Sequence, residues 1–101
     1  MPDIDADPKD LDIVRALAQR FAPGVEIWAF GSRVNGTAGN RSDLDIALVT
    51  SKPLEIGALA DLKEAFSESD LPFRVDVVDW AATEPRFREI IAQKHVVLSP
   101  P

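Results

Sequence analysis

The sequence predicts an α+β fold, an α/β two-layer arrangement in which helices pack against a small mixed β-sheet. Its predicted elements follow one another as helix, strand, loop, strand, helix, strand and helix, an order typical of helices layered on a sheet. One predicted strand is almost continuously apolar, as expected where a strand is covered on both faces. With 101 residues and no cysteine, the chain is long enough to bury a core without disulfide bonds, and we expect one domain over residues 1–101.

Start signals and apolar spacing define the helices. Asp7 and Pro8 combine an N-cap acceptor with a proline at the first helical position, and apolar residues at helical spacing continue over residues 8–21. The same spacing predicts a helix over about residues 55–68 and a shorter helix that begins within residues 83–86. We expect four apolar side chains of these helices in the core: Phe21, Leu62, Phe66 and Phe87.

Runs of β-branched and apolar residues predict strands over residues 25–30, 44–50 and 74–80. A last short strand is predicted over residues 96–98. Three side chains in or near these strands are expected to serve packing or lie at the surface rather than take part in chemistry: Trp28, Trp80 and the single histidine, His95.

Composition excludes several classes of protein. Seventeen acidic against eleven basic residues give a net charge of −6, which argues against a nucleic-acid-binding surface. No apolar run approaches the roughly 18 residues of a membrane span, and the acidic first residues lack the features of a signal peptide. We therefore expect a cytoplasmic protein. If it handles a polyphosphate, its negative charge indicates that it does so through metal ions and a few local donors.

The loop between the first two predicted strands begins with Gly31 and Ser32. Glycine lets the backbone approach a bulky anion closely, and serine adds a hydroxyl group and an N–H group. A helical turn starting there would direct further N–H groups at the anion. Arg33 follows and has the geometry to clamp a phosphate with two hydrogen bonds. The alternatives are a common turn dipeptide and a solvated surface arginine.

Asp43 and Asp45 end the same loop. Side chains at i and i+2 of a strand project to the same side, and two adjacent carboxylates repel unless a cation shares them. Carboxylate oxygens together with water and substrate phosphate suit Mg²⁺. The alternative is that an aspartate at the start of a strand forms a turn, or that the pair arises by chance in an acidic chain.

Asp76 lies between two valines in the third predicted strand, where an unpaired carboxylate is costly. If that strand lies beside the second, Asp76 joins Asp43 and Asp45 in a three-carboxylate cluster. Such a cluster can hold two Mg²⁺ ions about 3.5–4 Å apart, which activate an attacking hydroxyl and steady a leaving pyrophosphate. One alternative is that Asp76 lies on an edge strand and faces water. The other is that Asp79 takes this role, although its side chain would project to the opposite face of the strand.

The combined motif, Gly31-Ser32, ten intervening residues and Asp43-x-Asp45, followed by a later strand aspartate, resembles the signature of the DNA polymerase β-like nucleotidyltransferase superfamily. The chain length looks like that of the minimal nucleotidyltransferases (MNT). These prokaryotic proteins are usually paired with a small all-helical HEPN partner in a toxin–antitoxin-type system. The stretch AFGSRVNGTAGNRSDLDIALV carries the core motif, and LKEAFSESDLPFRVDVVDW and FREII also look like a bacterial MNT subgroup.

The resemblance implies a nucleotidyltransferase core and a role for each residue of the motif. Gly31 and Ser32 would bind the triphosphate with Arg33 near it, while Asp43 and Asp45 would ligate both Mg²⁺ ions. Asp76 would ligate the catalytic metal and help deprotonate the attacking hydroxyl. Many members carry a basic residue where this chain has Asn35, which puts one phosphate contact in doubt.

The reaction implied is transfer of AMP from ATP to a hydroxyl group with release of pyrophosphate. In MNT antitoxins the acceptor is a tyrosine of the HEPN partner, whose RNase activity is thereby silenced. So short a chain has no helical domain to hold the base, which favours a pocket completed in a hetero-oligomer. The competing hypotheses are a non-catalytic nucleotide-binding module that neutralises its partner by contact, and transfer to a small molecule such as an aminoglycoside.

Overall fold

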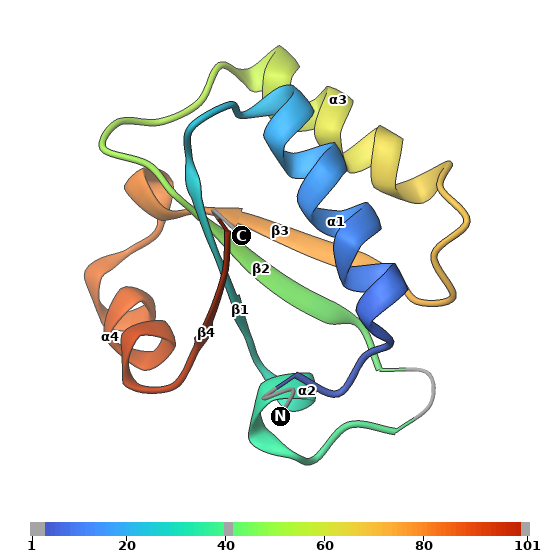
Figure 1. Cartoon of the computed structure of the whole chain (residues 1–101). Coiled ribbons are helices and arrows are strands. Elements are labelled where there is room, and N and C mark those ends of the chain that lie inside the picture. The colour runs from blue at the N-terminus through green and yellow to red at the C-terminus, as the bar shows by residue number, and fades with distance from the viewer. Residues whose placement is uncertain (1–3, 40–41, 100–101) are drawn as a thin grey trace.

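The computed structural model describes residues 4–39 and 42–99 and has one mixed four-stranded sheet with helices on both faces (Figure 1). The strands are β1 (Glu26–Phe30), β2 (Leu44–Val49), β3 (Val75–Asp79) and β4 (Val96–Ser99). The helices are α1 (Pro8–Phe21), α2 (Ser32–Asn35), α3 (Ile56–Ser67) and α4 (Pro85–Gln93), with a 3-10 turn over Trp80–Ala82 before α4. The predicted α+β fold is confirmed, and the predicted strands agree with the observed ones to within one residue.

The strand order is β3-β2-β1-β4, and only the β2–β3 pair is parallel. A parallel pair needs a crossover, which α3 provides. The second and third predicted strands are therefore neighbours, which is the condition on which the three-carboxylate cluster depends.

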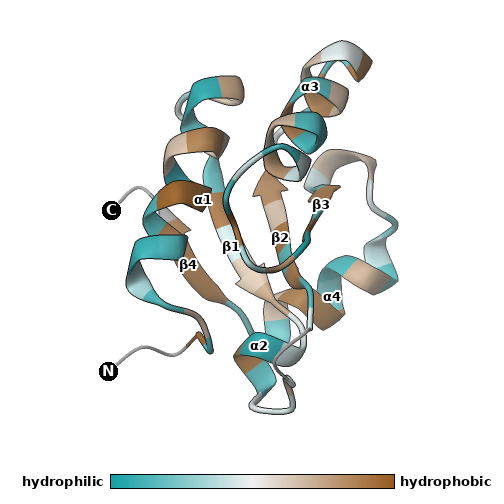
Figure 2. Cartoon of the chain, turned by 90° about the vertical axis from the view of Figure 1, so that its right-hand side faces the viewer, coloured by the Kyte–Doolittle hydropathy of each residue, from teal (hydrophilic) through white to brown (hydrophobic). Residues whose placement is uncertain are grey.

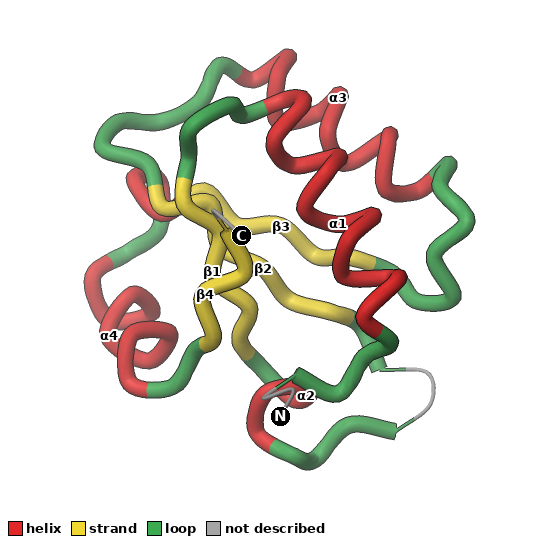
Figure 3. Tube along the Cα trace, viewed as in Figure 1, coloured by secondary structure: helices red, strands yellow, loops and turns green. Residues whose placement is uncertain are grey.

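Helices α1 and α3 cover one face of the sheet, and α4 lies on the other (Figures 1 and 3). Alternation along each strand divides the side chains between the two faces. Figure 2 shows the apolar colour concentrated along the strands. The face under α1 and α3 contributes the larger core, with Val14, Leu62 and Phe66 packed on Ile27, Ile46 and Val77.

The second face holds a smaller cluster beneath α4. Ile91 packs with Phe30 and Ala47, and Trp28, Trp80 and Phe87 surround them. Trp28 also packs against His95, with the rings stacked 3.8 Å apart, so both tryptophans and the histidine serve packing as predicted. Phe87 is half-buried rather than part of the main core, because it borders a cavity described below.

The predicted start of α1 is confirmed at the level of its hydrogen bonds. The Asp7 side chain accepts a hydrogen bond from the Lys9 N–H at 2.9 Å, and Pro8 occupies the first helical position.

Within the described residues, no helix has both the length and the apolar content needed to cross a membrane.

Candidate active site

Gly31 turns the chain from β1 into the single-turn helix α2. Its φ of +83° lies in the region that favours glycine, and its carbonyl oxygen accepts hydrogen bonds from Val34 and Asn35 at 3.0 and 2.9 Å. The turn predicted at this point is therefore helical. A Cβ atom at position 31 would overlap Oδ2 of Asp45. The backbone at Gly31 thus lies directly against a carboxylate that comes fourteen residues later in the chain.

Two of the predicted carboxylates face each other across the parallel strand pair. Asp45 and Asp76 are Cα partners in the β2–β3 register, so their side chains leave the sheet on the same face. Asp43 precedes Asp45 by two residues, just before β2 begins. Burial, and after it the charges of Asp76 and Asp43, raise the pKa of Asp45 above the ordinary value. The three aspartates therefore form one electrostatic unit.

Arg74 supplies a cation to this unit. Its Nη2 atom lies 3.1 Å from Oδ1 of Asp76, and its Nε atom lies 3.7 Å from Oδ2 of Asp43. The hydrogen bond to Asp76 is the main cause that raises the pKa of Arg74 further. The sequence reasoning missed this contact. The alternation of side chains along a strand could have predicted it, because Arg74 stands two residues before Asp76 and hence on the same face.

The chemistry of the donor set fits a divalent cation. The three carboxylates create a site that attracts positive charge. The pKa of Asp45 is raised, and the carboxylates of Asp43 and Asp76 share the guanidinium cation of Arg74. Asp43, Asp45 and Asp76 are the residues that would hold Mg²⁺. In residues 4–39 and 42–99, no three acidic, histidine or cysteine side chains already converge as a complete metal centre. Arg74 lies among these carboxylates and contacts those of Asp43 and Asp76.

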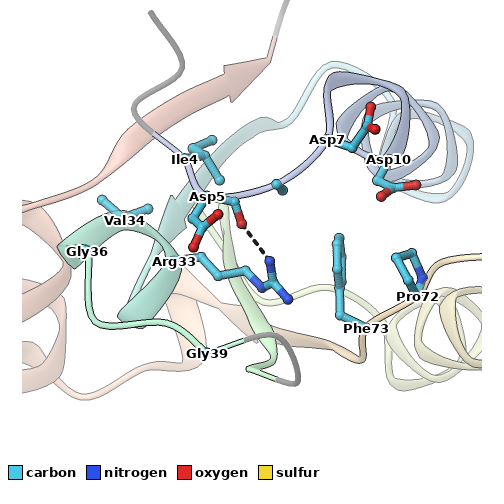
Figure 4. A pocket seen from close by; sticks show the side chains of 11 residues that line it. Ile4, Asp5, Asp7, Asp10, Arg33, Val34, Gly36, Gly39, Pro72 and Phe73 are labelled. Carbon is cyan, nitrogen blue, oxygen red and sulfur yellow. Dashed lines mark hydrogen bonds between the residues drawn. The ribbon is translucent and has the colours of Figure 1, made fainter.

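Arg33 is buried and held by contacts with several parts of the chain. The residue is 7% exposed, so the alternative of a solvated surface arginine is wrong. Nε donates to the Ser42 carbonyl at 2.9 Å. Nη1 donates to the Asp5 carbonyl at 2.5 Å, and the guanidinium lies 4.4 Å from the centre of the Phe73 ring (Figure 4). The surrounding cavity of about 590 Å³ is lined by none of the three aspartates of the unit.

Asp79, the competing candidate, lies on the opposite face. It is 7% exposed and accepts hydrogen bonds from the Thr50 hydroxyl at 2.5 Å and the Leu54 N–H at 2.7 Å. Both donors belong to the connection from β2 to α3, so Asp79 fixes that connection. The parity argument that favoured Asp76 over Asp79 thus agrees with the geometry.

A cavity of about 540 Å³ opens beside Asp45, between the sheet and α4. Gly31, Asn35 and Asp45 form its polar end, while Phe87 and Ile90 of α4 form an apolar wall. Lys94, directly after α4, also lines it and brings a positive charge to the cavity that Asn35 lines. Sequence reasoning did not select these α4 residues, because their place in the site depends on how α4 packs on the sheet.

Carboxylates on adjacent strands, set against a glycine-serine turn in a mixed sheet, define a class of protein, the nucleotidyltransferases. Residues 10–100 match the family Polymerase beta, Nucleotidyltransferase. The Probable protein adenylyltransferase MntA of Haemophilus influenzae is 50% identical over 95 residues, which are 94% of this chain and 83% of that protein. The chain therefore belongs to the polymerase beta nucleotidyltransferase family, and the predicted resemblance is confirmed.

Solved structures share the fold. A chain of a toxin–antitoxin with AMP-PNP aligns with a TM-score of 0.75 and 26% identity, over 87% of this chain and 71% of that one. A chain of the tri-AMPylated Shewanella oneidensis HEPN toxin in complex with MNT antitoxin aligns with a TM-score of 0.70 over 89% of this chain and 69% of that one. At 23% identity, the second likeness concerns the fold alone.

Proposed function

We propose that this chain transfers AMP from ATP to a hydroxyl group, that of a tyrosine on a helical HEPN partner protein, and acts as the partner's antitoxin. The pairing of Asp45 with Asp76 across β2 and β3, with the Gly31 backbone against Asp45, is the observation that carries the proposal. The 50% identical MntA, a probable protein adenylyltransferase, supports the reaction. The toxin–antitoxin with AMP-PNP supports ATP as the donor.

The cavity beside Asp45 has the chemistry that such a nucleotide needs. The triphosphate would lie at the polar end, near the backbone of Gly31 and Ser32, where glycine permits a close approach. The nucleoside would lie along the apolar wall of α4. Lys94 would supply the positive charge that the uncharged Asn35 does not provide.

The metal ligands proposed are Asp43 and Asp45 for two Mg²⁺ ions, with Asp76 binding the catalytic one. When bound, Mg²⁺ would offset the charge of the triphosphate and of the leaving pyrophosphate. The tyrosine oxygen forms a bond to the α-phosphorus as the bond from that phosphorus to the bridging oxygen breaks. Pyrophosphate leaves with the electron pair of the broken bond. Asp76 accepts the hydroxyl proton, which its half-exposed position at the edge strand β3 allows.

Intact-mass spectrometry of the partner after incubation with the chain, ATP and Mg²⁺ tests the proposal. The expected result is a mass increase by one or more AMP units. Asp43→Asn and Asp45→Asn should abolish the increase, whereas Asp61→Asn, at an exposed position of α3, should leave it unchanged. An increase that persists in either site variant would refute the assignment of the site.

The same variants separate catalysis from neutralisation by contact. A chain with Asp43, Asp45 and Asp76 all changed to Asn should still bind the partner but leave its RNase activity intact. If the triple variant neutralises the partner at full strength, the chain acts as a binding module and the catalytic proposal fails.

A further inference from the structure

Arg33 is a buried cation that touches three separate parts of the chain. It lies in α2 directly after Ser32, and its side chain reaches the segment before β2 at Ser42. It also reaches the N-terminal segment at Asp5 and the segment before β3 at Phe73 (Figure 4). The Asp5 N–H donates back to the Arg33 carbonyl at 2.7 Å. Four segments therefore meet on one side chain.

Two of these three contacts are adjacent in the sequence to residues of the candidate site. Ser42 directly precedes Asp43, and Phe73 directly precedes Arg74, which pairs with Asp43 and Asp76. The Leu44 N–H donates to the Arg74 carbonyl at 2.8 Å and ties the starts of β2 and β3 together. A shift of Arg33 would therefore move Asp43 relative to the carboxylates on the strands.

If Arg33 bound a phosphate, its guanidinium would have to be free to turn towards that phosphate. A buried charge is costly unless it is hydrogen-bonded, and Arg33 meets this need with backbone carbonyls and an aromatic face. Among the described residues, no carboxylate lies within ion-pair distance of it. Turning the guanidinium towards a triphosphate would break both hydrogen bonds and leave the Ser42 and Asp5 carbonyls without this donor.

We propose that Arg33 is a positioning residue, which holds Asp43 in place for metal binding through the Ser42 carbonyl and does not bind the triphosphate. The inference rests on the proposed function, since it assumes that Asp43 is a metal ligand. The planar guanidinium fork is needed, because a lysine ammonium cannot serve the Ser42 and Asp5 carbonyls in the same geometry.

The chain offers a matched control. Arg88 of α4 also donates to two backbone carbonyls, those of Trp80 at 2.8 Å and Ala81 at 3.0 Å, and its guanidinium lies 5.9 Å from the centre of the Trp80 ring. Arg88 contacts the turn that follows β3, four residues beyond Asp76, and none of its printed contacts is to a residue next to a carboxylate of the unit. Arg33→Lys and Arg88→Lys therefore make the same chemical change, but only the first should alter the site.

The experiment is calorimetric titration of the full chain with Mn²⁺ without nucleotide, alongside amide hydrogen exchange of residues 42–45. Arg33→Lys should weaken Mn²⁺ binding by about tenfold or more and speed exchange, as loss of an outer-shell partner does at metal sites. Arg88→Lys should change neither measurement. If Arg33→Lys fails to fold, Phe73→Leu should weaken Mn²⁺ binding in the same direction, because it removes the aromatic face and keeps an apolar side chain.

Wild-type Mn²⁺ affinity in Arg33→Lys would overturn the inference, since a phosphate clamp would leave metal binding without nucleotide unchanged. Asp43→Asn separates this failure from that of the proposed function. If Asp43→Asn loses Mn²⁺ binding and Arg33→Lys does not, only the role of Arg33 is refuted. If Asp43→Asn binds Mn²⁺ as the wild type does, the metal site and the inference fall together.

Discussion

The backbone of Gly31 lies so close to the Asp45 carboxylate that no side chain fits between them. A Cβ atom at position 31 would also lie 3.1 Å from Cγ of Asp45, and the φ of +83° strains any other residue. The two residues are brought together by the antiparallel β1–β2 pair, in which Phe30 faces Asp45. Two independent features therefore require glycine at position 31, namely its positive φ angle and the close approach of the Asp45 carboxylate.

Gly31→Ala should abolish most of the transfer activity. The new methyl group must displace either the backbone at the proposed phosphate site or the carboxylate of Asp45. Displacement by about 1 Å is enough to cost about 100-fold in rate. The measurement is the rate of partner modification under saturating ATP and Mg²⁺.

Gly24→Ala is the matched control for this change. Gly24 has a φ of +79°, yet a Cβ atom there would meet nothing within 4 Å. Both variants should lose about 1–3 kcal/mol of stability from backbone strain, but Gly24→Ala should keep wild-type activity. Equal loss of activity in the two variants would show that strain alone matters and that the contact with Asp45 does not.

Asp45→Asn should stabilise the folded protein at neutral pH when divalent cations are removed. Burial, with the charges of Asp76 and Asp43, raises the pKa of Asp45, so the folded state holds this proton more tightly than the unfolded state. The wild type therefore loses stability as pH rises from the ordinary aspartate pKa of 3.8 through the raised folded-state value. Asparagine does not ionise, so the advantage of Asp45→Asn should grow across this window and vanish below it.

Thermal unfolding in EDTA at a series of pH values measures this difference. Asp61→Asn controls for the loss of one negative charge at an exposed position. A neutral-pH melting temperature of Asp45→Asn below that of the wild type would contradict the prediction. Addition of Mg²⁺ should stabilise the wild type more than the variant, because the variant lacks one of the proposed ligands.

Side-chain alternation was enough to predict the carboxylate unit. Asp43, Asp45 and Asp76 were expected to share a face because side chains alternate along a strand, on the condition that the third predicted strand lies beside the second, as β3 lies beside β2. The choice of Asp76 over Asp79 followed from the same rule. These residues were predictable because their placement depends on local strand geometry.

Arg33 and Lys94 were not predictable in this way. The contacts of Arg33 come from residues 5, 42 and 73, which only the complete fold brings together. The place of Lys94 in the cavity depends on the packing of α4 against the second face of the sheet. A motif identifies the residue types of a site, but the partners of a long side chain depend on tertiary contacts that the motif does not contain.

Arg74→Gln should strengthen the binding of Mn²⁺ in the absence of nucleotide. A metal ion that enters the unit must compete with the guanidinium for the carboxylates of Asp43 and Asp76. Glutamine removes the competing charge, and a few-fold increase in affinity is expected because the arginine is largely exposed. Calorimetric titration measures the affinity, and Arg86→Gln, at an exposed position of α4, is the control. Weaker binding in Arg74→Gln would mean that Arg74 orients the ligands rather than competes for them.

Asp76→Asn and Asp79→Asn should separate activity from stability within one strand. Asp79 is buried and accepts hydrogen bonds from Thr50 and Leu54, so loss of its charge should destabilise the protein by about 1–3 kcal/mol and spare Mn²⁺ binding. Asp76 is half-exposed, so Asp76→Asn should change stability by no more than about 0.5 kcal/mol and abolish partner modification. Urea unfolding and intact-mass spectrometry of the partner measure the two effects. If Asp79→Asn abolished modification while Asp76→Asn kept it, the catalytic carboxylate of β3 would be Asp79, and the parity argument would be wrong.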